Sequence, residues 1–338
     1  AAFLPPGTVP AALLHATGCP RYDFCAEPWR AALPKPSIEP GYVLINTNFP
    51  VANPRFSDSS SAEEDAMVQA GFSREFARQF VVDAGNAYRA VLETSTRLAK
   101  HFTGVQFVLR PHPFENIASY DVLTELPNFH VRQDGTSLEW ISGARLLVHQ
   151  NCSTAIEATM LQVEPLSMEW FNTPSLRLDA ATRVSRGAGS ERDLIEMVEQ
   201  GLDGRLPPVG KDTEKFRQRI IDDLFTAVDG AIAAARGGKR GGRSTMPQPS
   251  LRGVAAGAIR RALGYKTSSA LRRSYSAPKN ERRRLGKAFA PEMVNSVLQR
   301  ICAAAGDGRN FVAQRVTGDT RSMSRALSGA SLQLTEAV

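Results

Sequence analysis

The chain has 338 residues, a formal net charge of +7 and 42% hydrophobic residues, which is enough for about two domains with a sizeable core. It contains no apolar run near the ~20 residues that a bilayer-spanning helix needs, so we expect no transmembrane segment. The four cysteines (Cys19, Cys25, Cys152, Cys302) are scattered without metal-ligand spacing, which predicts free thiols in a reducing compartment and no metal site.

The first 40 residues are rich in proline, and this composition is typical of a linker or of the remnant of an N-terminal domain. The sequence begins with Ala1 rather than Met, so we expect a fragment or a processed start. Within this stretch, residues 18–23 (GCPRYD) read by themselves as a polar turn.

The first clear strand is predicted at residues 42–46 (YVLIN), and it ends in Asn46, Thr47 and Asn48. These polar residues fit either the edge of a ligand crevice or an ordinary turn, because Asn and Thr are common in turns. A capping-box pattern at residues 61–64 then opens a short helix, and a long helical pattern extends from residue 73 to about 101.

The next predicted strand, at residues 107–110, leads directly into a Pro-His-Pro sequence. The two prolines end the strand and fix the backbone around His112. Candidate ligand contacts just past this strand are Arg110, His112, Pro113, Glu115 and Asn116. A lone histidine is more often structural, but the flanking prolines and the neighbouring Arg110 favour ligand contact, with charge-assisted hydrogen bonds to a phosphate.

Further patterns predict a strand at residues 129–132, one or two helical turns at 137–142 and a buried strand at 145–149. A small, polar turn at 150–154 then leads into a helix at 155–162, whose first amides would be unpaired and able to bind an anion. The candidate contacts in this stretch are Asn151, Ser153, Thr154 and Glu157. Glu157 fits either a ribose diol or a surface carboxylate favoured near a helix start. For Cys152, a packing role is favoured over a nucleophile.

After a strand at residues 165–169, helices are predicted at 190–202 and about 212–236. The alternation of strands and helices predicts an α/β fold: a Rossmann-like parallel sheet with helices on both faces. In such a sheet the strand ends converge on one crevice, so we expect the Pro-His-Pro sequence and the turn at 150–154 to face each other across it. The expected division is a domain at 41–236, a flexible linker at 237–250, a basic amphipathic helical region at 251–305 and disorder at 306–338.

The charge is distributed unevenly. From residue 239 onward there are 19 Lys and Arg against 5 Asp and Glu, so this tail carries +14 and the preceding residues carry −7. Such a tail predicts an anionic partner. Few aromatic residues argue against nucleic acid, and basic amphipathic helices favour an anionic membrane surface, through residues 251–305.

The sequence lacks the motifs of several common enzyme classes. No glycine-rich dinucleotide or P-loop fingerprint is present, and no convincing Ser/His/Asp triad or metal pattern is found. These gaps argue against an NAD-dependent enzyme and against an ATPase.

The ordered set GCPRYD, YVLINTNF, FVLRPHPFEN and WISGARLLVHQNCSTAIEA resembles bacterial surface carbohydrate biosynthesis proteins, relatives of the GT-B glycosyltransferases that build capsule and lipopolysaccharide. The resemblance covers roughly residues 15–175, and KAFAPEMVNSVLQRI is similar to the C-terminal end of the family. It implies a two-Rossmann enzyme whose C-terminal half binds a nucleotide-sugar, with no bound metal and no cofactor. By analogy, the donor-binding HP motif comprises Arg110, His112 and Pro113, the phosphate-binding helix start comprises Asn151, Ser153 and Thr154, and Glu157 is a nucleotide contact.

One departure from the family pattern matters. The GxPRxD segment closes the N-terminal domain of such an enzyme, yet only about twenty residues precede it here. The resemblance therefore implies a glycosyltransferase that is incomplete as this chain alone, and it identifies no catalytic base.

The sequence thus predicts a glycosyltransferase-type donor-binding protein of bacterial surface polysaccharide biosynthesis, cytoplasmic and peripheral at the inner face of the cytoplasmic membrane. Its partners would be a nucleotide-sugar donor and a glycan or lipid-linked acceptor. One alternative is a CDP-glycerol-type glycerophosphotransferase on the same scaffold, and related capsule transferases use CMP-linked Kdo or sialic acid. A second alternative is a non-enzymatic protein that binds membrane or nucleic acid through its basic tail.

Overall fold

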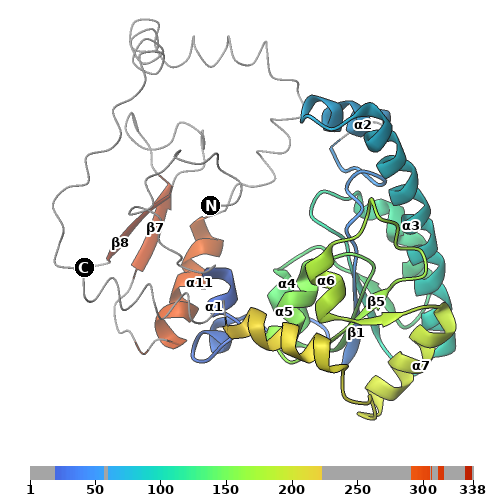
Figure 1. Ribbon diagram of the computed structural model, residues 1–338. Coiled ribbons are helices and arrows are strands. Elements are labelled where there is room, and N and C mark those ends of the chain that lie inside the picture. The colour runs from blue at the N-terminus through green and yellow to red at the C-terminus, as the bar shows by residue number, and fades with distance from the viewer. Residues whose placement is uncertain are drawn as a thin grey trace, which may run out of the picture.

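The computed structural model describes residues 20–56, 60–222, 291–304, 306, 311–315 and 332–336. Its centre is a six-stranded sheet in which every neighbouring pair is parallel (Figure 1). The strands are β1 (Tyr42–Asn46), β2 (Phe107–Arg110), β3 (Phe129–Val131), β4 (Ala144–His149), β5 (Glu164–Met168) and β6 (Arg186–Ala188).

The strand order across this sheet is β3-β2-β1-β4-β5-β6. This is the order of a Rossmann sheet, and it reverses between β1 and β4. The predicted fold class, an α/β Rossmann-like parallel sheet with helices on both faces, is confirmed. The carboxyl ends of β1 and β4 therefore flank the topological switch point, where open α/β sheets bind their ligands.

The strands form because short apolar runs are buried on both faces of the sheet, as parallel sheets require. In β1, Val43 and Ile45 belong to one core cluster while Tyr42 and Leu44 belong to the other, and all four are at most 1% exposed. In the same way, β2 and β4 contribute alternate side chains to the two separate hydrophobic layers.

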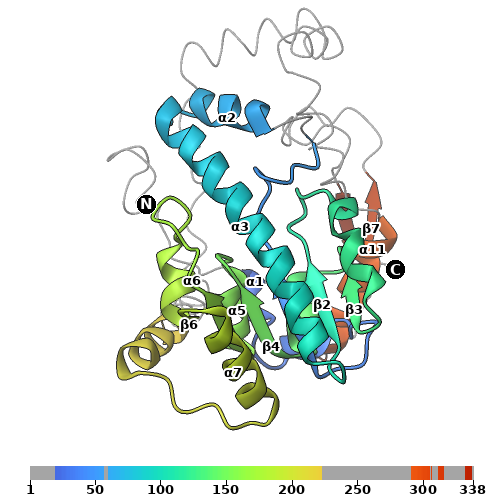
Figure 2. The same cartoon turned by 90° about the vertical axis from the view of Figure 1, so that its right-hand side faces the viewer.

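One layer is covered by α3 (Arg74–His101), by α7 (Glu191–Leu202) and by the 3-10 helix η3 (Ile117–Glu125), and Figure 2 shows α3 and α7 in front of the sheet. Ser73 starts α3 by accepting a hydrogen bond from the Phe76 amide. The short helix α2 (Ser60–Gln69) precedes α3 and packs against it.

The other layer is covered by α4 (Ser137–Ser142) and α5 (Thr154–Met160), together with the N-terminal segment that contains α1 (Pro20–Asp23) and η2 (Trp29–Ala32). A capping box between Thr136 and Glu139 fixes the start of α4. Next to α5, α6 (Asp179–Val184) packs with a small third cluster that includes Phe216. Stretches 20–23 and 29–32 are thus helical, although the sequence predicts a linker there.

Three described elements follow residue 290. The helix α11 (Pro291–Ala304) contacts η2, where the Arg300 side chain donates to the Ala32 carbonyl. β7 (Phe311–Arg315) and β8 (Leu332–Glu336) pair antiparallel within the stretch that the sequence predicts to be disordered. β8 (LQLTE) alternates apolar and polar residues, a period-two signal that the overall composition of 306–338 conceals, whereas β7 (FVAQR) is a short apolar run without such alternation. Among the described residues, no helix is both long and apolar enough to cross a membrane.

Some predicted features lie outside the described residues. The helix expected at residues 212–236 is helical as far as residue 222, and its remainder is outside them. The linker at 237–250 and the basic region up to residue 290 are outside them as well. Conversely, the sequence did not predict β6, α6 or η3, because these elements carry no clear apolar period.

Candidate functional site

The last residues of three neighbouring strands form a polar row at the carboxyl edge. Asn46 is in register with Arg110 on one side and with His149 on the other. Two positions earlier, Leu44, Val108 and Leu147 all belong to the core layer of α4 and α5. Since side chains alternate along a strand, the three polar side chains point to that same face.

Asn46 connects β1 to the start of α5. Its Nδ2 donates to Thr154 Oγ1 at 2.9 Å, and Thr154 Oγ1 in turn donates to Cys152 Sγ at 3.1 Å. Asn46 is only 4% exposed, and within the described part of the chain its Oδ1 accepts no hydrogen bond. An unpaired buried acceptor costs free energy, so this atom is suited to a donor group of a ligand.

Arg110 is held by the loop that precedes α4. Its Nη2 donates to the carbonyls of Gly135 at 2.6 Å and Asp134 at 3.3 Å. Burial lowers the pKa of Arg110, and the nearby Asp134 and Glu139 carboxylates oppose this effect. Like Asn46 Oδ1, the buried Nε has no hydrogen-bond partner among the described residues. The ends of β1 and β2 thus carry one unused acceptor and one unused donor.

His112 sits directly after the end of β2 with a defined tautomer. Its Nδ1 accepts the Phe114 amide at 3.2 Å, so the neutral ring carries its proton on Nε2. Burial lowers the pKa of His112, and the neighbouring Arg110 charge lowers it further. At neutral pH the ring is therefore a neutral N–H donor rather than a cation. Pro113, which follows it, is exposed.

Glu115 does not face solvent: it is 0% exposed. Its carboxylate accepts from the amides of His112 and Phe49, from the Thr47 hydroxyl and from the Tyr120 hydroxyl. Burial raises the pKa of Glu115 and these hydrogen bonds oppose the rise. Of the predicted contacts, Glu115 and Thr47 therefore hold the loops after β1 and β2 together rather than present polar atoms to a ligand. Asn116, unlike Glu115, is exposed.

The Asn116 side chain accepts the Ala118 amide and caps η3. Asn151 on the opposite loop is used similarly, because its Oδ1 accepts the Leu178 amide at 2.7 Å. Its carbonyl accepts from Asn48 Nδ2 at 3.1 Å, which connects the loops after β1 and β4 across the switch point. The structure thus joins the candidate edge at Asn48 to the turn at 150–154.

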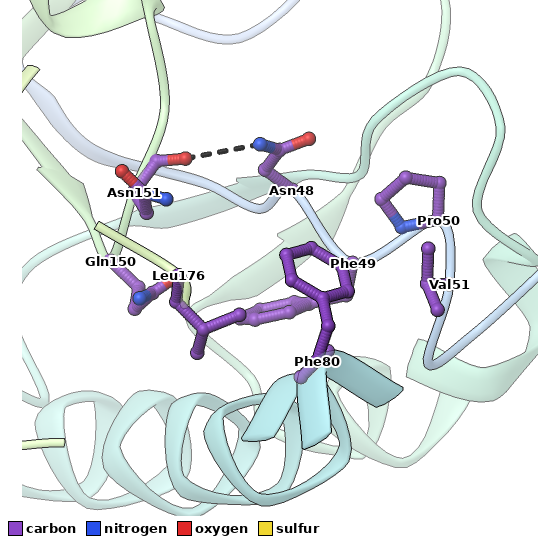
Figure 3. Close-up of a pocket in the computed structure, with 9 residues that line it drawn as sticks. Asn48, Phe49, Pro50, Val51, Phe80, Gln150, Asn151 and Leu176 are labelled. Atoms are coloured by element: carbon purple, nitrogen blue, oxygen red, sulfur yellow. Dashed lines mark hydrogen bonds between the residues drawn. The ribbon is translucent and has the colours of Figure 1, made fainter. Parts of the chain in front are cut away.

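A pocket of about 90 Å³ lies beside this connection, on the side of α3 (Figure 3). Its polar rim is Asn48, Gln150 and Asn151, and its apolar lining includes Phe49, Pro50, Val51, Phe80, Ala84 and Leu176. A ligand pocket usually measures roughly 300–1,000 Å³. This pocket therefore suits one ring of a larger ligand, and the rest of the ligand would lie along the open edge.

Glu157, a predicted nucleotide contact, is 4% exposed and already paired. It accepts from Arg21 Nε at 2.6 Å and from Ser137 Oγ at 2.8 Å, and Arg21 also donates to Ser137. Sequence reasoning missed this use of the GCPRYD segment. Through Arg21, this segment joins α4 and α5 on the site's face. The exposed Ser153, a further predicted contact, makes no capping hydrogen bond to α5.

Two residues near the end of β4, His149 in the strand and Cys152 in the following turn, are buried and hydrogen-bonded within the fold. His149 Nδ1 accepts the Cys152 amide, so its Nε2–H donates to Ser185 Oγ, which donates on to the Ala181 carbonyl. Burial lowers the pKa of His149 to about 4 and raises the pKa of the Cys152 thiol. The favoured packing role of Cys152 agrees with this, because the thiolate, not the thiol, is the nucleophile.

Within the described ranges, no group of three or more His, Cys, Asp and Glu side chains could hold a metal ion. No protein-family model and no curated protein sequence matches the chain.

Several solved structures resemble it. CalG4, the calicheamicin glycosyltransferase, is 14% identical over 61% of this chain and 43% of its own, with a TM-score of 0.34. The UDP-GlcNAc 2-epimerase of Methanocaldococcus jannaschii, in complex with UDP-GlcNAc and UDP, is 14% identical over 62% and 54%, with a TM-score of 0.34. The wall teichoic acid polymerase TagF is 12% identical over 64% and 51%, with a TM-score of 0.31.

The solved structures that the chain resembles thus include glycosyltransferases, UDP-GlcNAc 2-epimerases and a wall teichoic acid polymerase. The chain spans only 43%, 54% and 51% of the lengths of these three structures, respectively. Sequence identities of 14% or less indicate a similar fold and nothing about function, so the functional argument rests on the residues of the site.

Proposed function

We propose that the α/β domain binds a nucleotide-sugar and forms the donor-binding half of a glycosyltransferase for bacterial surface polysaccharide. The observation that carries the proposal is the unused pair at the switch point, Asn46 Oδ1 and Arg110 Nε. Both atoms are buried at the ends of adjacent strands, on the edge where Rossmann sheets bind nucleotides. The motif resemblance then selects a nucleotide-sugar among phosphate-bearing ligands.

In the proposed mechanism the domain stabilises the departing nucleotide. Arg110 supplies positive charge, and the neutral His112 donates from Nε2 to a phosphate oxygen, a charge-assisted hydrogen bond. The Phe114 amide, which bonds to Nδ1, holds the ring in the tautomer that can donate. An acceptor hydroxyl would then attack the sugar as the nucleotide leaves.

The pocket on the α3 side would take one ring of the donor. Its apolar lining and amide-bearing rim suit a sugar or a base, which need apolar contact and a few hydrogen bonds. Because Arg110 and His112 lie at the carboxyl end of β2 and the pocket lies between the ends of β1 and β4, the donor would lie across these strand ends. The CDP-glycerol alternative uses the same leaving-group chemistry and differs in donor preference.

The test is calorimetric titration of the His112→Ala variant with the nucleotide that binds the unmodified chain best. A hydrogen bond to a charged group contributes about 1.5–3 kcal/mol, so we expect roughly a tenfold to hundredfold loss of affinity. The control is His101→Ala, at the exposed far end of α3. Equal affinity of both variants and the unmodified chain would refute the role of His112.

A further inference from the structure

Three phenylalanines follow one another at four-residue spacing, Phe72 just before α3 and Phe76 and Phe80 in its first turns, and they form what we name the aromatic strip. Phe72 is 50% exposed and Phe76 is 38% exposed. Their rings stack with centroids 5.5 Å apart, and the centroids of Phe76 and Phe80 are 6.1 Å apart. Exposed apolar side chains that adjoin one another, rather than standing singly, are candidates for a binding surface.

The aromatic strip is continuous with the pocket. Phe80, its last member, lines the pocket beside Phe49 and Leu176, as Figure 3 shows. An apolar path thus begins at the exposed Phe72 and ends at the switch point. A ligand that follows this path would bring its other end to the proposed donor site.

The geometry of α3 puts the aromatic strip beyond the sheet. The helix has 28 residues and is about 42 Å long, whereas the five-residue β1 spans about 17 Å. The chain leaves the carboxyl end of β1, forms α2 and then returns along the sheet as α3. The first turns of α3, next to α2, therefore project past the edge that holds the site (Figure 2). The strip therefore stands where a second substrate would approach.

The chemistry of the strip and its surroundings selects the ligand. Phenylalanine offers apolar surface and no hydrogen bond, which suits hydrocarbon rather than the hydroxyl groups of a glycan. The nearby Arg74 pairs with Glu64 and Asp65 at 3.2 Å, and Arg78 lies 3.9 Å from Glu64. The cationic side chains beside the strip are thus neutralised by carboxylates, which argues against an anionic membrane surface.

We infer that the aromatic strip binds the hydrocarbon chain of a lipid-linked acceptor and leads its reactive end toward the donor that the pocket would hold. The inference rests on the proposed function for the identity of the ligand as an acceptor. The binding of an apolar chain rests on the exposed phenylalanines and their continuity with the pocket alone.

The test uses farnesyl phosphate as the probe, titrated below its critical micelle concentration, with inorganic phosphate titrated in parallel. The variant is the double substitution Phe72→Ser and Phe76→Ser. Its matched control is Val122→Ser, which removes an apolar side chain that is 58% exposed on η3. Circular dichroism and urea unfolding verify that both variants are folded.

We expect the unmodified chain to bind farnesyl phosphate and not inorganic phosphate, the double variant to bind at least about tenfold more weakly, and the control to be unchanged. Equal affinity of the double variant, or equal binding of inorganic phosphate, would overturn the inference. The inference would also be overturned if the unmodified chain were a dimer that bound no farnesyl phosphate and if the double variant were a monomer. Nucleotide titrations of the same samples separate the two proposals: chain binding without nucleotide binding would uphold the strip and refute the donor site.

Discussion

The buried imidazole of His149 makes a quantitative prediction about acid stability. Nδ1 accepts the Cys152 amide and Nε2 donates to Ser185, so the native network needs the neutral ring. Burial lowers the pKa of His149 from its ordinary value of 6.5 to about 4. In the unfolded chain the ring takes up a proton near pH 6.5, so its contribution to stability is complete above that pH and is lost as the pH falls toward 4.

The linkage relation gives the magnitude. With native and unfolded pKa values of about 4 and 6.5, the free energy of unfolding falls by roughly 2 kcal/mol between pH 7 and pH 5 because of this residue. We expect the His149→Gln variant, which cannot titrate, to lack this part of the pH dependence. It would be less stable at pH 7 but lose about 2 kcal/mol less on acidification.

The assay is urea unfolding at pH 7 and pH 5, followed by tryptophan fluorescence, to which the buried Trp140 contributes. The exposed His101, replaced by Gln, serves as the control and should retain the pH dependence of the unmodified chain. If His149→Gln lost as much stability on acidification as the unmodified chain, the neutral, buried state of His149 would be refuted.

Further predictions concern packing, reactivity and membrane binding. Gly201→Ala should destabilise the fold by about 1–3 kcal/mol in urea unfolding, because the new Cβ would lie 2.7 Å from the Leu146 side chain. Gly85→Ala, where nothing lies within 4 Å of the new Cβ, should instead stabilise α3 by up to about 1 kcal/mol; similar effects of the two substitutions would contradict the packing of α7 on β4. The buried, protonated thiol of Cys152 should react with iodoacetamide only after unfolding, as peptide mass spectrometry would show, and rapid labelling of the folded chain would contradict its burial. Replacement of the arginines at 282–284 by glutamate should abolish co-sedimentation with vesicles that contain phosphatidylserine, and unchanged sedimentation would refute the proposed role of the basic region.

The sequence predicts the centre of the sheet well because β1, β2 and β4 each contain an apolar run that stops at a polar residue. In β1, the YVLIN run gives both the buried strand and the polar end at Asn46. The three-residue β6 (RGA) has no such run. It belongs to the sheet because it pairs with β5, a neighbour in space. For the same reason, local composition could not predict that the strand belongs to the sheet.

The candidate site was predicted in part. The convergence of Asn46, Arg110 and Thr154 follows from the rule that parallel strands end at one edge, and it holds. The inward turn of Glu115 and the pairing of Glu157 with the distant GCPRYD segment carry no local signal in the sequence. Both depend on which side chain finds a partner after folding, and spacing along a chain does not determine this.

The most direct test of the central claim is calorimetric titration of the purified chain with CMP, CDP, UDP and GDP. The account predicts that one of them binds with clear preference, since the strand ends supply Arg110, His112 and the unused Asn46 oxygen at one edge. Preference for CMP would indicate a Kdo or sialic acid donor, CDP a polyol phosphate, and UDP or GDP a hexose. Binding of none of the four would contradict the assignment of this edge as a donor site.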